Sequence, residues 1–171
     1  PKVMLQEMDG MIAQGIDVSG IRISNRAHVV LPYHCEMDGY IEELKGDNKV
    51  GTTKNGIGPC YADRDNRIGI RVCDFIDKEE FAKRLKENLE LKNMEIVKLY
   101  GKEPMDYESM LKEYEGYADR IRPYVCDTIA LLHDELKADR KILFEGAQAT
   151  MLDIDYGTYP YVTASHPISG G

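Results

Sequence analysis

The sequence of 171 residues lacks the features of a membrane protein, a secreted protein or a nucleic-acid-binding protein. It has no apolar run long enough to cross a bilayer, and no secretory signal peptide at its start. It also lacks an excess of positive charge, because its net charge is -8. An acidic chain repels nucleic-acid phosphates and anionic lipids. We therefore expect a cytoplasmic protein with no nucleic-acid partner and no membrane partner.

Cysteine and histidine are few and show no metal-ligand spacing. The cysteines are Cys35, Cys60, Cys73 and Cys126, and none forms a C-x-x-C pair. Reduced thiols are the favoured interpretation, although an even number of cysteines leaves disulfides open. The histidines are His28, His34, His133 and His166. None pairs convincingly with another histidine or an acidic cluster, so we predict no metal site.

The composition is that of a globular chain, with 43% hydrophobic and 30% charged residues. Both ends look like cuts through a longer protein. The chain opens at Pro1 inside a helical apolar pattern and closes directly after a dense loop sequence. We therefore expect a single fragment, 1–171, of a larger domain. Within it we predict a helical subdomain at 76–140, and a strand plus nucleotide-binding loop at 141–171.

Apolar periodicity predicts helices at the N-terminus, at residues 31–44 and from residue 77 onward. Asp77 is placed to cap the third of these, with Glu80 at the capping-box position and Gly101 at the C-terminal cap. A further helix runs from about residue 106 until Pro123 breaks it. Its tyrosines are interpreted as packing residues rather than as a ligand-binding box. The apolar stripe then continues as far as Leu136.

Strands are predicted in two places. Residues 20–32 contain enough Ile, Val and Leu for one or two short buried strands, and "KILFEG" (141–146) is typical of a buried strand that stops at a glycine. The stretch "IGIRVCDFI" fits either a strand or a helix. A strand that ends in a polar, glycine-bearing loop is where α/β proteins bind ligands.

The stretch "VGTTKNGIGP" (50–59) has the composition of a phosphate-binding loop. It fails the triphosphate motif G-x-x-x-x-G-K-[ST], because Ile57 and Gly58 stand where lysine and a hydroxyl residue should follow. Threonine hydroxyls and glycine N–H groups still suit a single phosphate monoester, with Arg64, Arg67 or Arg71 as a charged clamp. The alternative is a surface turn followed by solvated arginines.

Asp153 and Asp155 in "LDIDYG" are two residues apart and would share a face in a strand. They could serve acid–base chemistry or bind a cation. The commoner alternative is that they cap turns and accept backbone N–H groups.

Two long stretches together resemble one family. "GTTKNGIGPCYADRDNRIGIRV" is similar to the G-T-T and G-I-G-P-x-Y-x-x-K-x-x-R segment of adenylosuccinate synthetases. "LFEGAQATMLDIDYGTYPYVTAS" is similar to their F-E-G-A-Q-G-T-x-L-D-I-D block. The resemblance covers essentially the whole chain. It implies an α/β fold, of which this chain would be a helix-rich central piece of a P-loop-like parallel-sheet enzyme, with a few strands.

The resemblance also implies a function. These ligases join inosine monophosphate (IMP) to aspartate with consumption of GTP, in a homodimer that uses Mg²⁺. By resemblance, Thr53 and Thr163 hold the 5′-phosphate of IMP, and Gln148 contacts the base near its 6-oxygen. Arg67 reaches the phosphate in the neighbouring subunit. The resemblance thus implies that the loop at 50–59 binds the phosphate of IMP and not a phosphate of GTP.

The chain also departs from the family pattern. Arg64 replaces the family lysine, which leaves its role uncertain, and Ala149 and Ala164 replace a glycine and a serine. The family's N-terminal glycine-rich loop with its catalytic aspartate, its histidine motif, and its aspartate- and guanine-binding segments do not occur in this sequence. We therefore predict no catalytic residue here, no Mg²⁺ or GTP bound by this chain alone, and an inactive isolated chain. The alternative is a non-catalytic module that keeps the fold for oligomerisation or nucleotide sensing.

Overall fold

The computed structural model describes residues 1–49 and 51–170, and it packs them into two compact units. The first unit combines Pro1–Val29 with Ile68–Arg140, and the second combines Val30–Arg67 with Lys141–Gly171. Residues 76–140 thus belong to the first unit, and residues 141–170 to the second. No helix among the described residues is long and apolar enough to cross a membrane.

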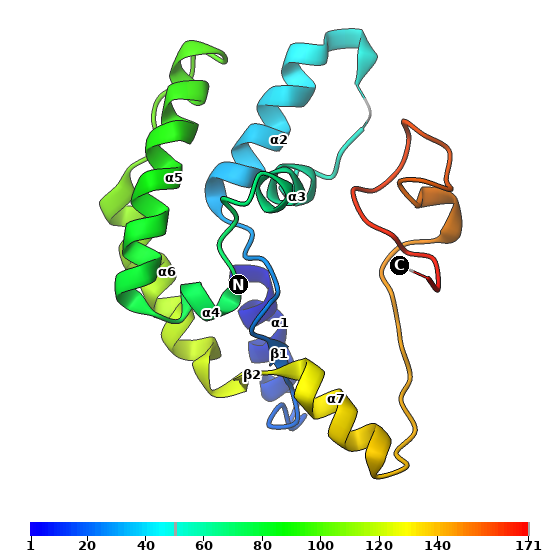
Figure 1. Cartoon of the computed structure of the whole chain (residues 1–171). Helices are drawn as coiled ribbons and strands as arrows, with labels where there is room; N and C mark the ends of the chain where they lie inside the picture. The colour runs from blue at the N-terminus through cyan, green and yellow to red at the C-terminus, as the bar shows by residue number, and fades with distance from the viewer. Residues whose placement is uncertain (50, 171) are drawn as a thin grey trace. The chain divides into compact units, whose positions relative to one another are not determined.

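The first unit consists mainly of helices. They are α1 (Lys2–Ala13), α4 (Val72–Phe75), α5 (Lys78–Lys98), α6 (Tyr107–Ile121) and α7 (Thr128–Lys137). Helices α5 and α6 pack side by side (Figure 1). Two short strands, β1 (Ile23–Ser24) and β2 (Val125–Cys126), pair in parallel with Ile23 opposite Val125. The predicted helix-rich α/β class is therefore confirmed.

Aromatic packing forms the core of the first unit. The rings of Phe75 and Phe81 meet edge to face with centroids 4.9 Å apart, and Tyr114 lies 6.3 Å from Phe75. Leu85 and Ile96 continue this buried face along α5. Burial of each such side chain stabilises the fold by about 1.5–3 kcal/mol. The packing role predicted for the tyrosines of α6 is confirmed at Tyr114.

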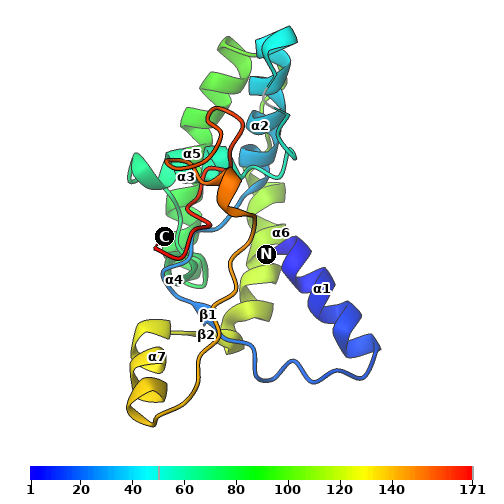
Figure 2. The same ribbon diagram turned by 90° about the vertical axis from the view of Figure 1, so that its right-hand side faces the viewer.

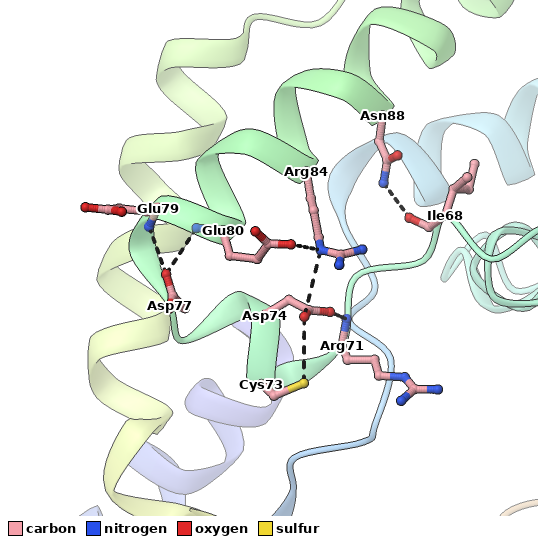
Figure 3. Close-up of polar contacts among 9 residues, drawn as sticks. All are labelled: Ile68, Arg71, Cys73, Asp74, Asp77, Glu79, Glu80, Arg84 and Asn88. Atoms are coloured by element: carbon pink, nitrogen blue, oxygen red, sulfur yellow. Dashed lines mark hydrogen bonds and ion pairs between the residues drawn. The ribbon is translucent and has the colours of Figure 1, made fainter.

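Polar contacts fix the start of α5 (Figure 3). Asp77 caps the helix as predicted, because its Oδ1 accepts the N–H groups of Glu79 and Glu80, each at 3.1 Å. The Glu80 carboxylate accepts from Nε of Arg84 at 2.6 Å. Further along the helix, Asn88 donates to the carbonyl of Ile68 at 2.8 Å (Figure 3). The helix is thus tied to the extended segment that precedes α4.

The other helix boundaries mostly agree with the sequence. Helix α5 ends at Lys98 with Leu99 as its C-cap, so the cap predicted at Gly101 lies two residues further on, where φ is +63°. The predicted break at Pro123 is a short 3-10 turn, Arg122–Tyr124. The ambiguous stretch at 68–76 divides into extended chain followed by α4. Helix α7 forms as predicted, but none of its residues is buried.

The strand predictions are less successful. Residues 20–32 contain only the two-residue β1, although Val29 is buried and donates its N–H to Ile70 at 2.9 Å. The predicted buried strand at 141–146 is wrong for this structure. Leu143 is 90% and Phe144 is 79% exposed, and both views draw the segment as plain trace (Figures 1 and 2). A strand needs a neighbour for its ladder, and no described strand pairs with this segment.

The second unit contains α2 (Pro32–Lys45), the 3-10 turn Gly46–Asn48, α3 (Ile57–Asp65) and the 3-10 turn Thr150–Leu152. Helices α2 and α3 lie side by side (Figures 1 and 2). The predicted helix at 31–44 is confirmed, and the 3-10 turn Gly46–Asn48 follows it. The predicted loop at 50–59 is confirmed for residues 51–56, while Val50 lies outside the described residues and Ile57 begins α3.

We predict that Asp77→Ala lowers the free energy of unfolding by about 1 kcal/mol, because two N–H groups at the start of α5 lose their acceptor. Urea denaturation followed by circular dichroism measures this loss. Asp77→Asn, which keeps an acceptor, should stay close to the parent chain, and so should Glu87→Ala at an exposed site on the same helix. Equal losses in all three variants would contradict the cap.

Candidate functional site

A pocket of about 400 Å³ in the second unit brings together most of the predicted site residues. Thr52 and Thr53 line it from the loop before α3, Gln148 and Thr163 line it from the C-terminal segment, and Asp38 lines it from α2. Its size suits a small molecule. Apart from Asp38, these polar groups carry no charge, and they can donate or accept hydrogen bonds.

The two arginines predicted for the site do not line this pocket. Arg67 is exposed directly after α3, and its φ is +62°. Arg64 is exposed on α3, where its guanidinium lies 5.4 Å from the ring centroid of Tyr61 and its Nε lies 3.9 Å from Asp65. The structure therefore brings Thr53, Gln148 and Thr163 together, and it leaves both arginines outside.

One face of α2 positions the loop. His34, Asp38 and Glu42 are four residues apart and so project from the same side of the helix. All three are buried, at 1%, 6% and 4% exposure. His34 contacts helix α3. Asp38 contacts the end of the loop at Gly56, and Glu42 contacts its start at Gly51.

Two of these contacts are carboxylate-to-backbone bonds. Glu42 accepts the N–H of Gly51 at 2.9 Å, and Asp38 accepts the N–H of Gly56 at 3.1 Å. The sequence had suggested that glycine N–H groups of this loop donate to phosphate. For these two glycines, the structure shows buried carboxylates as the acceptors of the N–H groups. The hydroxyls of Thr52 and Thr53 line the pocket between these two held glycines, beside the start of α3.

The third contact joins α2 to α3. His34 Nδ1 accepts the N–H of Leu31 at 2.9 Å, and Nε2 lies 3.0 Å from Oδ2 of Asp63. A nitrogen that accepts carries no proton, so the ring proton is on Nε2 and is donated to Asp63. Cys60, buried nearby on α3, has its pKa raised to about 11 by burial and by the Asp63 charge, so its thiol stays protonated.

Gly56 allows this close approach. Its φ is +73°, and a Cβ built there would lie 2.7 Å from the backbone N of Cys35 and 2.7 Å from the carbonyl carbon of His34. Both the backbone conformation and the space therefore require glycine. The end of the loop lies directly on the backbone of α2.

The C-terminal segment is held by Asp153. This buried carboxylate accepts the N–H groups of Asp155 and Tyr156 at 2.9 and 3.0 Å, and its Oδ2 lies 3.4 Å from Nδ1 of His166. Burial alone would raise the pKa of Asp153, but the two N–H donors and His166 together hold it below its ordinary value. Of the roles considered for Asp153, the structure shows the commoner one, acceptance of backbone N–H groups in a turn. Thr163 is placed by its own N–H, which donates to Leu152 at 2.8 Å.

Backbone strain is found at the predicted site residues. Gln148 has a φ of +77° and Arg67 a φ of +62°, and Lys54, next to Thr53, has a φ of +56°. Residues other than glycine rarely adopt this left-handed conformation, and where they do they are often at functional sites.

Sequence reasoning missed the buried residues that support the pocket, namely His34, Asp38, Glu42 and Asp63. Their signal was the four-residue spacing of three polar side chains along one predicted helix. That spacing is also common on solvated helix faces, so only the structure shows that this face is buried.

Comparison with known proteins gives matches along the whole chain. The family model of adenylosuccinate synthetase matches residues 1–171. The chain is 54% identical to an adenylosuccinate synthetase of Brachyspira hyodysenteriae and 56% identical to one of Lactobacillus delbrueckii subsp. bulgaricus. Each match spans 100% of this chain and 40% of the relative, so the chain covers well under half the length of these proteins.

A solved structure gives the same match. The fully ligated adenylosuccinate synthetase from Plasmodium falciparum is 34% identical to this chain, with a TM-score of 0.84. The match covers 96% of this chain and 39% of the other.

We predict opposite effects for the same substitution at two glycines of the second unit. Gly56→Ala should lower the free energy of unfolding by about 2 kcal/mol, because of its positive φ and the contact with α2. Gly39→Ala, inside α2 with nothing within 4 Å of the added Cβ, should raise it by up to about 1 kcal/mol. Urea denaturation of both variants measures these changes. A tolerated Gly56→Ala would contradict the described contact between loop and helix.

Proposed function

The chain belongs to the adenylosuccinate synthetase family, and from this membership we propose that it forms the IMP-binding and dimerising part of a GTP-dependent ligase. The whole enzyme joins IMP and L-aspartate to give adenylosuccinate, a step of AMP biosynthesis. GTP phosphorylates the purine 6-oxygen, and the amine of aspartate then displaces that phosphate.

The observation that carries this proposal is the pocket lined by Thr53, Gln148 and Thr163. The two threonines come from segments far apart in the sequence and lie around one space. Hydroxyl groups suit a phosphate monoester, because each neutral hydroxyl can donate a hydrogen bond to an anionic phosphate oxygen. The Gln148 amide can donate to negative charge that develops on the 6-oxygen of the base.

The pocket also has apolar walls. Ile57, Leu152 and Val162 contribute to its lining, and such side chains suit the faces of a purine ring. The first turn of α3 lies at the same pocket through Ile57 and Gly58, and a helix N-terminus favours an anion. These features support a ligand with a flat apolar body and an anionic end.

Arg67 is proposed to act in a homodimer, on the phosphate bound by the partner chain. It does not line the pocket of its own chain, and it is exposed with a strained backbone. An arginine that binds a ligand of the partner chain must have a side chain that is exposed on its own chain. The planar guanidinium suits bidentate contact with phosphate.

The isolated chain is proposed to be inactive. Mg²⁺ and GTP are needed by the whole enzyme, and the residues present do not fit a metal. Among the described residues, no group of three or more His, Cys, Asp or Glu side chains could hold a metal ion. Formation of adenylosuccinate by the pure chain would contradict this part of the proposal.

We predict that the chain binds IMP but not inosine, which lacks the phosphate. Thr53→Ala and Thr163→Ala should each weaken IMP binding about tenfold, the loss expected for one hydrogen bond to a charged group. Isothermal titration calorimetry measures this, with Thr128→Ala in the first unit as the matched control. Equal binding of inosine and IMP would contradict a phosphate site.

The dimer part of the proposal has its own test. Arg67→Ala chains and Thr53→Ala chains should each bind IMP weakly when pure. In a mixture, one of the two pockets of each mixed dimer receives an intact Thr53 from one chain and an intact Arg67 from the other, so tight IMP sites should reappear. If mixing restores no sites, Arg67 does not act across an interface.

A further inference from the structure

We propose that Asp38 and Glu42 are positioning residues for the glycine loop, which we define as residues 51–56. They hold the N–H groups of Gly51 and Gly56 at its two ends, so that the loop offers its threonine hydroxyls to the ligand rather than these two N–H groups. This inference rests on the IMP-binding function proposed above. It goes beyond that function because it assigns a role to two carboxylates of α2, which have no proton to donate to a phosphate.

The geometry places the two carboxylates one helical turn apart on α2, and their acceptor oxygens lie at different points of the loop. Glu42 Oε2 is 2.9 Å from the Gly51 nitrogen, and Asp38 Oδ2 is 3.1 Å from the Gly56 nitrogen. Thr52 and Thr53 lie between these two fixed points and line the pocket. The loop is therefore held on both sides of its threonines.

The charge of these residues favours a positioning role over direct binding. A carboxylate beside a phosphate site opposes the binding of an anion. Because Asp38 lines the pocket, its charge alone would lower the affinity for the ligand. Both side chains are buried, and burial of a carboxylate is costly unless it accepts hydrogen bonds. Acceptance of the loop N–H groups meets this requirement, and it fixes the loop before any ligand arrives.

Substitutions at position 38 separate the effect of the hydrogen bond from the effect of the charge. An asparagine at position 38 can accept the Gly56 N–H with its amide oxygen, and it removes the negative charge next to the phosphate. An alanine removes both. A positioning residue should thus be rescued by asparagine, whereas a residue needed for its charge should not.

The first experiment is an IMP titration of the full chain by calorimetry. We expect Asp38→Ala to weaken IMP binding about tenfold, because the loop loses one of its two fixed points. Asp38→Asn should bind IMP at least as tightly as the parent chain. Glu36→Ala, at an exposed site on the same helix, is the control and should change nothing. Unchanged binding in Asp38→Ala, or equal losses in the Ala and Asn variants, would overturn the inference.

The second experiment needs no ligand. Amide hydrogen exchange by NMR should show the Gly56 N–H exchanging about tenfold faster in Asp38→Ala, with Gly51 little changed, and the reverse in Glu42→Ala. Asp38→Asn and Glu42→Gln should keep the slow exchange. If both glycines exchange equally in all variants, the carboxylates do not hold the loop. If the parent chain fails to bind IMP, the proposed function fails, and the exchange pattern alone decides this inference.

Discussion

The second unit depends on hydrogen bonds between buried carboxylates of α2 and backbone N–H groups of the glycine loop. A loop that lies against a helix leaves peptide groups away from water, and each needs a partner. Asp38 and Glu42 supply two of these partners. They lie one helical turn apart on α2 and fix the loop at Gly51 and Gly56, on both sides of Thr52 and Thr53. The positions of Thr52 and Thr53 and the start of α3 follow from that arrangement, whereas Asp153 and the Leu152 carbonyl hold the C-terminal side of the pocket.

The two units distribute stability and function differently. The first has an aromatic core around Phe75 and Phe81, a capped helix and few polar groups inside. The second has a buried polar helix face, and it carries the positive φ angles of Lys54, Arg67 and Gln148. Buried polar networks and strained residues cost stability and persist where the surroundings require them. The buried polar face of α2 and the strained Gln148 contribute to the pocket, whereas the strained Arg67 lies outside it.

Local patterns account for what the sequence could predict. The Asp77 cap and the stripe of Phe81, Leu85 and Leu89 involve residues within one helix, so periodicity and capping rules are enough. The loop was recognised from its glycines and threonines. The meeting of Thr53 with Gln148 and Thr163 came from family resemblance, because contacts between distant segments have no local signal. The strand at 141–146 failed because a strand is defined by its neighbour, and Leu143 lies exposed without one. The partners of Gly51 and Gly56 were missed since a buried and a solvated polar helix face look the same in sequence.

A crystal structure of this chain with IMP would show directly which groups of the loop bind the phosphate. We expect phosphate oxygens within hydrogen-bonding distance of the hydroxyls of Thr53 and Thr163. We also expect the N–H groups of Gly51 and Gly56 to remain bonded to Glu42 and Asp38. A phosphate bound by those two glycine N–H groups, with the carboxylates displaced, would contradict the account, and so would IMP bound away from the pocket.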